Sequence, residues 1–184
     1  PYTTLFRSNY PISQTGVGKD YSIEELSSIF LKLEQRGAHN INLVTPTHYM
    51  WHIKEALSIS RSSGLEIPVV YNTSSYENPE AAALTGELAD VYLADIRYSN
   101  NNDAMKYSAC PDYREIVFNN IEQFIRNKPY PAINDNIMTS GVIVRVLVLP
   151  GKSGEVKEIL EFLKEIGTEH MYLSLMAQYH PYYQ

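Results

Sequence analysis

Short apolar runs alternate along this chain with longer segments of helical periodicity. The runs are rich in Val, Ile and Tyr, and they cover residues 41–44, 67–71, 91–94, 142–149 and 170–175. Near-continuous apolar runs of this length are typical of strands buried on both faces of a parallel sheet. The pattern therefore predicts five parallel strands, most of them ending in polar residues or in Pro-Gly.

The segments between these runs carry apolar residues three and four positions apart, as amphipathic helices do. The first segment begins with a capping-box pattern, Ser22 followed three residues later by Glu25, and it ends at Gly37. The other predicted helices cover about residues 49–62, 78–88, 113–126 and 154–166. The polar stretches at residues 99–103 and 127–140 are predicted to be mobile loops.

The alternation of strands and helices implies right-handed βαβ units. Two architectures satisfy that order, a small open sheet or part of a (β/α) barrel. A length of 184 residues and a hydrophobic content of 44% suit one compact α/β domain.

The composition of the chain argues against several classes of function. The formal net charge is −6, so the chain offers no basic stripe of the kind that binds nucleic acid. The longest apolar run is interrupted by Arg145 and is too short to cross a bilayer. A single cysteine, Cys110, excludes an internal disulfide. These features predict a cytoplasmic protein without nucleic-acid or membrane partners.

Polar side chains crowd around the first predicted strand, between residues 37 and 48. They include Asn40, Asn42, Thr45, Thr47 and His48. In parallel α/β folds the chemistry collects where strands end and loops begin, so this segment is a candidate active-site rim. Helix capping is the alternative, because Thr45 or Thr47 could cap the helix that follows.

The later strands are followed by further polar groups. Asn72, Thr73 and Ser74 come after the second apolar run, and Asp95 and Arg97 after the third. The opposite charges of Asp95 and Arg97 could form a structural ion pair or contact a substrate.

Arg145 lies inside an apolar strand, where an unpaired guanidinium would be costly to bury. It must therefore reach a carboxylate. His48 and His52 are four residues apart, a spacing that can bring two imidazoles to one metal ion. No carboxylate cluster nearby completes such a site, so surface or capping histidines are the preferred interpretation.

The first eight residues, PYTTLFRS, lack an initiator Met and match neither a signal peptide nor a tag. They are the peptide that a common short-read sequencing adapter encodes in one frame. We therefore expect residues 1–8 to be adapter-derived and residues 9–184 to be an incomplete domain of a longer protein.

Several longer motifs occur in order between Asn9 and about Tyr182. They are NYPISQTGVGKDYSIEEL, GAHNINLVTPTHY, IPVVYNTSSYE, DVYLADIRY, AMKYSACPDY, VIVRVLVLPG and YLSLMAQYHPYY. Together they resemble radical S-adenosylmethionine (SAM) enzymes of the pyruvate formate-lyase activating enzyme-like family. Several long motifs in order are more specific than one short pattern.

The resemblance implies a partial TIM-like (β/α) barrel of the radical SAM type, with about five parallel strands in this chain, helices outside, and both ends truncated. It also implies a [4Fe-4S] cluster, held by a C-x-x-x-C-x-x-C loop, that cleaves SAM reductively to a 5′-deoxyadenosyl radical. The second and third family cysteines would fall at Thr4 and Arg7, and the first before Pro1. Because thiolate ligands are indispensable to such a cluster, the chain by itself is expected to be inactive.

The same resemblance implies roles for individual positions, without assigning a catalytic residue or a metal ligand. The SAM-contacting positions would be Asn40, Asn42, Thr45, Thr47, Asn72, Thr73, Ser74, Arg145, Met176 and Gln178, and the substrate-contacting positions would be His48, Asp95 and Arg97. The expected partners are a glycyl radical enzyme or another substrate, and a flavodoxin or ferredoxin as electron donor.

Two other functions are consistent with a barrel. A sugar-phosphate aldolase or isomerase is one, but a Schiff-base aldolase needs a strand lysine, and none of the five predicted strands contains one. A phosphate site would depend on the glycine-containing loop at residues 150–154, which helix capping also explains. The non-enzymatic alternative is a cluster-free barrel that binds a nucleoside or another small molecule.

Overall fold

The computed structural model describes residues 16–177. Its helices are α2 (Ile23–Gln35), α3 (Met50–Ser62), α4 (Pro79–Leu84), α5 (Asn101–Ser108), α6 (Tyr113–Asn127) and α7 (Ser153–Ile166). Its strands are β1 (Ile41–Val44), β2 (Val69–Thr73), β3 (Val91–Ile96), β4 (Ala132–Asn134), β5 (Ile137–Leu147) and β6 (Met171–Met176), with short 3₁₀ turns at η2 (Pro46–Tyr49), η3 (Thr85–Glu87) and η4 (Thr168–His170). The predictions for residues 1–8 and for Gln178 concern positions outside this range. None of the helices described combines the length and the apolarity needed to cross a bilayer.

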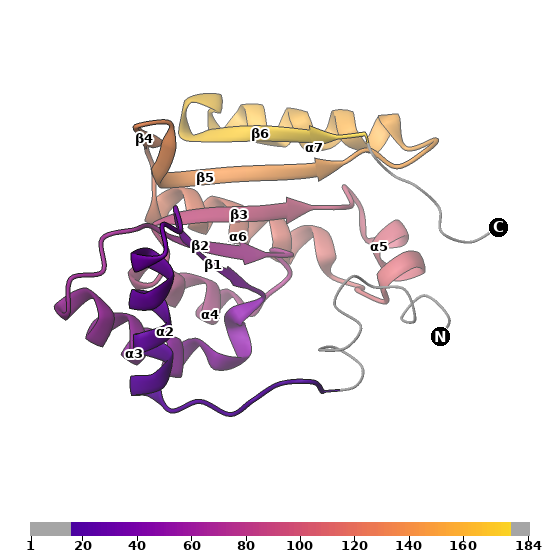
Figure 1. Cartoon of the computed structure of the whole chain (residues 1–184). Helices are drawn as coiled ribbons and strands as arrows, with labels where there is room; N and C mark the ends of the chain where they lie inside the picture. Colours follow the sequence, from indigo (N-terminus) through magenta and orange to yellow (C-terminus); the bar gives the residue numbers. More distant parts are fainter. Residues whose placement is uncertain (1–15, 178–184) are drawn as a thin grey trace.

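Five strands form a parallel sheet in the order β1-β2-β3-β5-β6, and the short β4 pairs antiparallel with the first part of β5 (Figure 1). The predicted mostly parallel α/β architecture is therefore confirmed. Within residues 16–177 the sheet is open, because β1 pairs only with β2 and β6 pairs only with β5.

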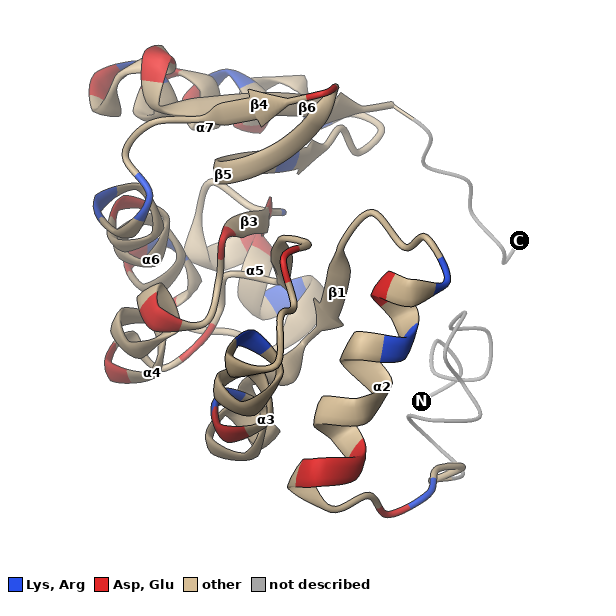
Figure 2. Ribbon diagram, turned by 60° about the vertical axis from the view of Figure 1, so that its left-hand side comes forward, with Lys and Arg blue, Asp and Glu red and all other residues tan. Residues whose placement is uncertain are grey.

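Helices α3, α4, α6 and α7 cover one face of this sheet (Figures 1 and 2). Alternate strand residues point to that face and are fully buried, among them Tyr92, Ala94, Val142, Val144 and Val146. They belong to the same core as Ile121 and Phe124 of α6, and the ring of Phe124 stacks on Tyr92 with centroids 4.4 Å apart. Burial of these apolar side chains holds the helices to the sheet.

A second core lies at the β1 side of the sheet, where α2 packs on α3. Its buried members include Phe30 of α2, Ile53 and Leu57 of α3, and Ile41 of β1. The predicted capping box at the start of α2 is confirmed, because Ser22 and Glu25 each accept a hydrogen bond from the backbone N–H of the other.

The two polar stretches that we predicted as loops contain regular structure, and that prediction is wrong. The first stretch begins α5, whose amino end is capped by Asn100, since its Oδ1 accepts from the N–H of Asp103 at 3.0 Å. The second contains the hairpin between β4 and β5. Its turn residues Asp135 and Asn136 have φ angles of 49° and 63°, which are typical of a tight hairpin turn. Caps and turns use the same polar residues as loops, and this similarity explains the error.

Strand β5 changes partner at Gly141, where it leaves the hairpin with β4 and begins to pair with β3. Gly141 has a φ of +122°, and a Cβ there would lie 2.8 Å from the Cα of Pro131. Glycine is required here because any other side chain would collide with the backbone of the preceding loop.

The opposite face of the sheet carries no helix within residues 16–177, and we call it the open face (Figure 2). Its partly or fully exposed side chains come from all five parallel strands: Asn42, Val44, Asn72, Leu93, Asp95, Ile143, Arg145, Tyr172 and Ser174. Because it is continuous and accessible in the described chain, this face is the natural place to look for a site.

The packing of α6 on the sheet can be tested by a pair of matched substitutions. Ile121→Ala removes a fully buried side chain and should lower the free energy of unfolding by about 2–5 kcal/mol. Ile133→Ala, at a position of β4 that is 55% exposed, should change it by no more than about 0.5 kcal/mol. Urea unfolding followed by circular dichroism measures both. Equal effects of the two substitutions would contradict the packing described here.

Candidate functional site

Three polar side chains from neighbouring strands meet on the open face. The Nε of Arg145 donates to Oδ1 of Asp95 at 2.6 Å, and its Nη2 donates to Oδ1 of Asn72 at 2.9 Å. Asp95 also accepts from Nη2 of Arg97 at 3.3 Å. We call Asn72, Asp95 and Arg145 the open-face cluster.

The parallel register brings this cluster together. Asp95 of β3 lies directly beside Arg145 of β5, and Asn72 comes from β2, the next strand across. Successive strand side chains point to opposite faces, so Ala94 and Val144 enter the helix-covered core while Asp95 and Arg145 point away from it. The prediction that Arg145 must reach a carboxylate is therefore confirmed, and the carboxylate is that of Asp95.

The side chains of Asp95 and Arg145 are 15% and 26% exposed, so the pair is accessible from one side. The ion pair predicted between Asp95 and Arg97 also exists, but it is longer and Arg97 is 48% exposed. Bidentate or multiply bonded arginines are held in a defined orientation, and a guanidinium held in this way can present its remaining N–H groups to a ligand.

A cavity of about 320 Å³ opens beside the cluster. Its lining combines three charged side chains with apolar ones: Asp95, Arg97, Arg145, Ile96, Tyr98, Leu147, Leu149 and Met176. Small-molecule sites commonly have this composition, with a few polar groups placed in an apolar wall. A carboxylate and a guanidinium side by side complement a zwitterion, because each binds the group of opposite charge.

A second hydrogen-bonded network lies at the carboxyl end of β2, on the helix-covered side. The hydroxyl of Tyr71 donates to Oε2 of Glu77 at 2.9 Å and lies 3.2 Å from Oγ1 of Thr47, while Thr73 donates to the other carboxylate oxygen of Glu77. Burial first, and the charge of Glu77 second, raise the pKa of Tyr71, so its hydroxyl remains a neutral donor. This network ties η2 and the β2–α4 loop to the sheet, and it engages the Thr47 and Thr73 side chains that we predicted to bind a cofactor.

The candidates around β1 are not brought into the cluster. Asn40 precedes β1, so it lies at the opposite end of the strand from Thr45. Asn42 is exposed on the open face, and His48 is exposed in η2. Ser74 follows β2 directly.

Thr45 has an unusual backbone. Its φ of 50° is left-handed, and its N–H donates to the carbonyl of Asn72 at 2.8 Å. Thr45 occupies the N-cap position of η2 without making a side-chain capping bond. A β-branched residue in this conformation is strained, and strain of this kind concentrates at functional sites.

Sequence reasoning did not select several residues that the structure places at the carboxyl ends of the strands. Glu77 lies three positions after Ser74, in the polar segment that follows the second predicted strand. A carboxylate at that place could have been predicted to bond with the neighbouring hydroxyl groups. Tyr98, Leu147 and Leu149 gave no signal, because apolar residues at the end of a strand look the same as core residues.

The glycine-containing loop at residues 150–154 is a poor phosphate site. Nζ of Lys152 lies 2.5 Å from Asp103 and 3.0 Å from Glu155, so two carboxylates surround its charge. The hydrogen bond that Nζ donates to Asp103, together with the neighbouring Glu155 carboxylate, raises the pKa of Lys152. The side-chain contacts of Asp103 with Glu155 and Lys152 also lower the pKa of Asp103 to about 2. A phosphate would have to displace these partners.

Among residues 16–177, no group of three His, Cys, Asp or Glu side chains is placed to hold a metal ion. His48 and His52 are both exposed, and neither has a resolved hydrogen bond within that range.

The chain matches no protein-family model. It is similar to Uncharacterized protein MJ0674 of Methanocaldococcus jannaschii, with 28% identity over an alignment of 193 residues, gaps included, that covers all of the chain and 52% of the relative. The chain therefore spans about half the length of this curated relative. Since the relative's name states no activity, function has to be argued from the site itself.

The strength of the open-face ion pair can be measured by a double-mutant cycle. Asp95→Ala and Arg145→Ala, made singly and together, should give a coupling free energy of about 1–3 kcal/mol, because the pair is partly buried and shares a second hydrogen bond. The matched control is Lys157 and Glu161 on α7, which are 79% and 62% exposed and 3.8 Å apart. Their coupling should be about 0.3–0.5 kcal/mol. Similar couplings for the two pairs would rule out a defined cluster.

Proposed function

We propose that this chain is the SAM-binding part of a radical SAM enzyme, with SAM bound in the cavity on the open face. The observation that carries the proposal is the juxtaposition of Asp95 and Arg145 at the carboxyl ends of two adjacent parallel strands. Ligands of open α/β sheets bind at this end of the strands.

The charges of the cluster fit one end of SAM. The methionyl part of SAM carries a carboxylate and an ammonium group on the same carbon. In the proposed complex, Arg145 binds the carboxylate and Asp95 binds the ammonium group. Within residues 16–177, Nη1 of Arg145 makes no hydrogen bond, so this N–H group is available to a ligand without loss of the pair.

The remaining lining suits the rest of the molecule. Asn72 is hydrogen-bonded to Arg145 at the margin of the cavity, outside its lining, and its amide N–H groups are proposed to reach the ribose hydroxyls. Leu147, Leu149 and Met176 give the cavity an apolar wall for the adenine ring. A methionine adapts readily to such a planar group.

The fold is part of the same proposal. We propose that the five parallel strands form a partial (β/α) barrel, whose inner surface is the open face and whose outer layer is formed by α3, α4, α6 and α7. The one-sided arrangement of these helices supports it, since a barrel has helices on the outside only (Figure 2).

The cluster chemistry of such enzymes does not fit this chain. A [4Fe-4S] cluster supplies the electron that cleaves SAM, and it needs three thiolate ligands in this family. The sequence contains one cysteine, Cys110, so we derive no step through a cluster. The chain itself is proposed to bind and orient SAM. A glycyl radical enzyme or another substrate, and a flavodoxin or ferredoxin donor, belong to the proposal for a whole enzyme.

A cluster-free barrel that binds a small molecule is the second candidate. The single cysteine favours it, because binding requires only the cavity and the open-face cluster. The cluster-free barrel would bind a nucleoside or another small molecule, and the two candidates differ in the ligand where that molecule is a free amino acid rather than SAM.

SAM binding by isothermal titration calorimetry tests the proposal. Arg145→Gln should weaken SAM binding about 10- to 100-fold, because a charged hydrogen bond to the carboxylate is lost. Arg126→Gln, on α6 and 55% exposed, is the matched control and should leave it unchanged. Binding of 5′-deoxyadenosine, which lacks the amino-acid group, should be indifferent to Arg145→Gln.

The contrary results are distinct. An absence of SAM binding, or equal binding by the Arg145→Gln variant, would overturn the SAM proposal. Binding of free methionine as tight as that of SAM would favour the second candidate.

A further inference from the structure

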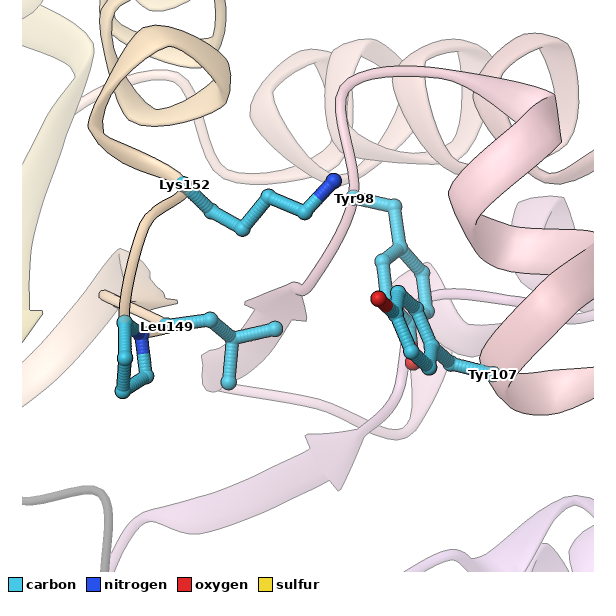
Figure 3. Close-up of a pocket in the computed structure, with 5 residues that line it drawn as sticks. Tyr98, Tyr107, Leu149 and Lys152 are labelled. Carbon is cyan, nitrogen blue, oxygen red and sulfur yellow. The ribbon is translucent and has the colours of Figure 1, made fainter.

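A second cavity, of about 360 Å³, lies between the β3–α5 segment and the β5–α7 loop. It is lined by Tyr98, Tyr107, Leu149, Pro150 and Lys152, and we call it the aromatic slot (Figure 3). Figure 3 shows two tyrosine rings forming one wall and Leu149 facing them from the other side, with the Lys152 side chain extended across one end.

The tyrosine wall consists of one buried ring, Tyr98, and one half-exposed ring, Tyr107. The planes of Tyr98 and Tyr107 are within 16° of parallel, with centroids 6.3 Å apart. Tyr98 is only 7% exposed, packs edge-on against Tyr113, and shares a 2.8 Å hydrogen bond between its hydroxyl and Oγ of Ser108. Tyr107 is 53% exposed, with Nζ of Lys106 lying 5.0 Å from its ring centroid, so part of its ring surface faces solvent.

Hydrogen-bonding capacity in the slot is largely occupied. Lys152 is paired with Asp103 and Glu155, and its Nζ lies 6.0 Å from the ring centroid of Tyr107. The hydroxyl of Tyr98 is engaged with Ser108, whereas that of Tyr107 makes no hydrogen bond within residues 16–177 and is the one free hydroxyl of the described lining. The walls therefore consist of aromatic faces, an aliphatic side chain, a proline ring and the methylenes of a lysine. Few of their groups could form hydrogen bonds with the polar atoms at the edge of a heterocyclic ring.

We propose that the aromatic slot binds a phenyl or indole ring. Such a ring fits between Leu149 and the tyrosine wall and needs only stacking and apolar contact. A nucleobase is disfavoured because its ring nitrogens and exocyclic groups would lose their hydrogen bonds to water without replacement. An anionic group is disfavoured because the charge of Lys152 is balanced by Asp103 and Glu155.

The slot is adjacent to the cavity of the open-face cluster, since Tyr98 and Leu149 line both. A ligand or substrate held beside Asp95 and Arg145 could therefore place an aromatic group in the slot. The proposal that the slot takes an aromatic ring does not depend on SAM binding, because it rests on the lining of the slot alone.

Ring binding can be measured with indole, as a free small molecule, and with N-acetyltryptophanamide, as the side chain appears in a peptide. Saturation-transfer NMR and calorimetry on the full chain should detect both probes. Tyr107→Ala should weaken their binding about tenfold by removing one stacking face, whereas Tyr107→Phe should keep it within about twofold. Met105→Ala, also on α5 and 55% exposed, is the matched control and should bind as the parent does.

The outcomes separate the possibilities. Binding of indole alone assigns the slot to a small molecule, and binding of N-acetyltryptophanamide as tight or tighter assigns it to a peptide side chain. Failure of both probes to bind, or equal binding by Tyr107→Ala, would overturn the proposal, as would tighter binding of adenosine than of indole. If SAM fails to bind while indole binds, the slot stands and the SAM proposal falls.

Discussion

Burial of one face of the parallel sheet is the constraint on which the rest of this structure depends. Tyr92, Val142, Val144 and Val146 are fully buried under the helices, and each such side chain stabilises the fold by about 1.5–3 kcal/mol when it leaves water. Because strand side chains alternate, this burial also determines what points the other way. A slip of one residue would put Asp95 and Arg145 into the apolar core, so the core itself fixes the position of the charged cluster.

The open-face cluster is better suited to recognition than to stability. The desolvation of both charges offsets much of their attraction, so the net contribution of the pair to folding is smaller than its coupling free energy. A guanidinium held by two partners, with a carboxylate beside it, is nevertheless a preorganised receptor for a ligand that carries both charges. The strained backbone of Thr45, bonded to the carbonyl of Asn72, lies at the same end of the sheet.

The two cavities at the carboxyl ends of β3 and β5 have different chemistry. The cavity beside Asp95 and Arg145 is charged, whereas the aromatic slot is lined by rings and aliphatic groups. They share Tyr98 and Leu149, so one ligand with a polar end and an aromatic end would contact both. The carboxylates of Asp103 and Glu155 surround Lys152 and would repel a phosphate group there, which disfavours a sugar-phosphate aldolase or isomerase.

The periodicity of the sequence by itself determined the five parallel strands, five of the helices and the need of Arg145 for a carboxylate, because these depend on local pattern and on the cost of burying a charge. The short helix α5 and the β4 hairpin were missed, since their caps and turns have the composition of loops. Only the tertiary structure decided that Asp95 is the carboxylate that pairs with Arg145, and that Tyr98, Tyr107 and Leu149 line one cavity. The physical reason is that such contacts join residues about 50 positions apart through strand register and helix packing, which no local pattern specifies.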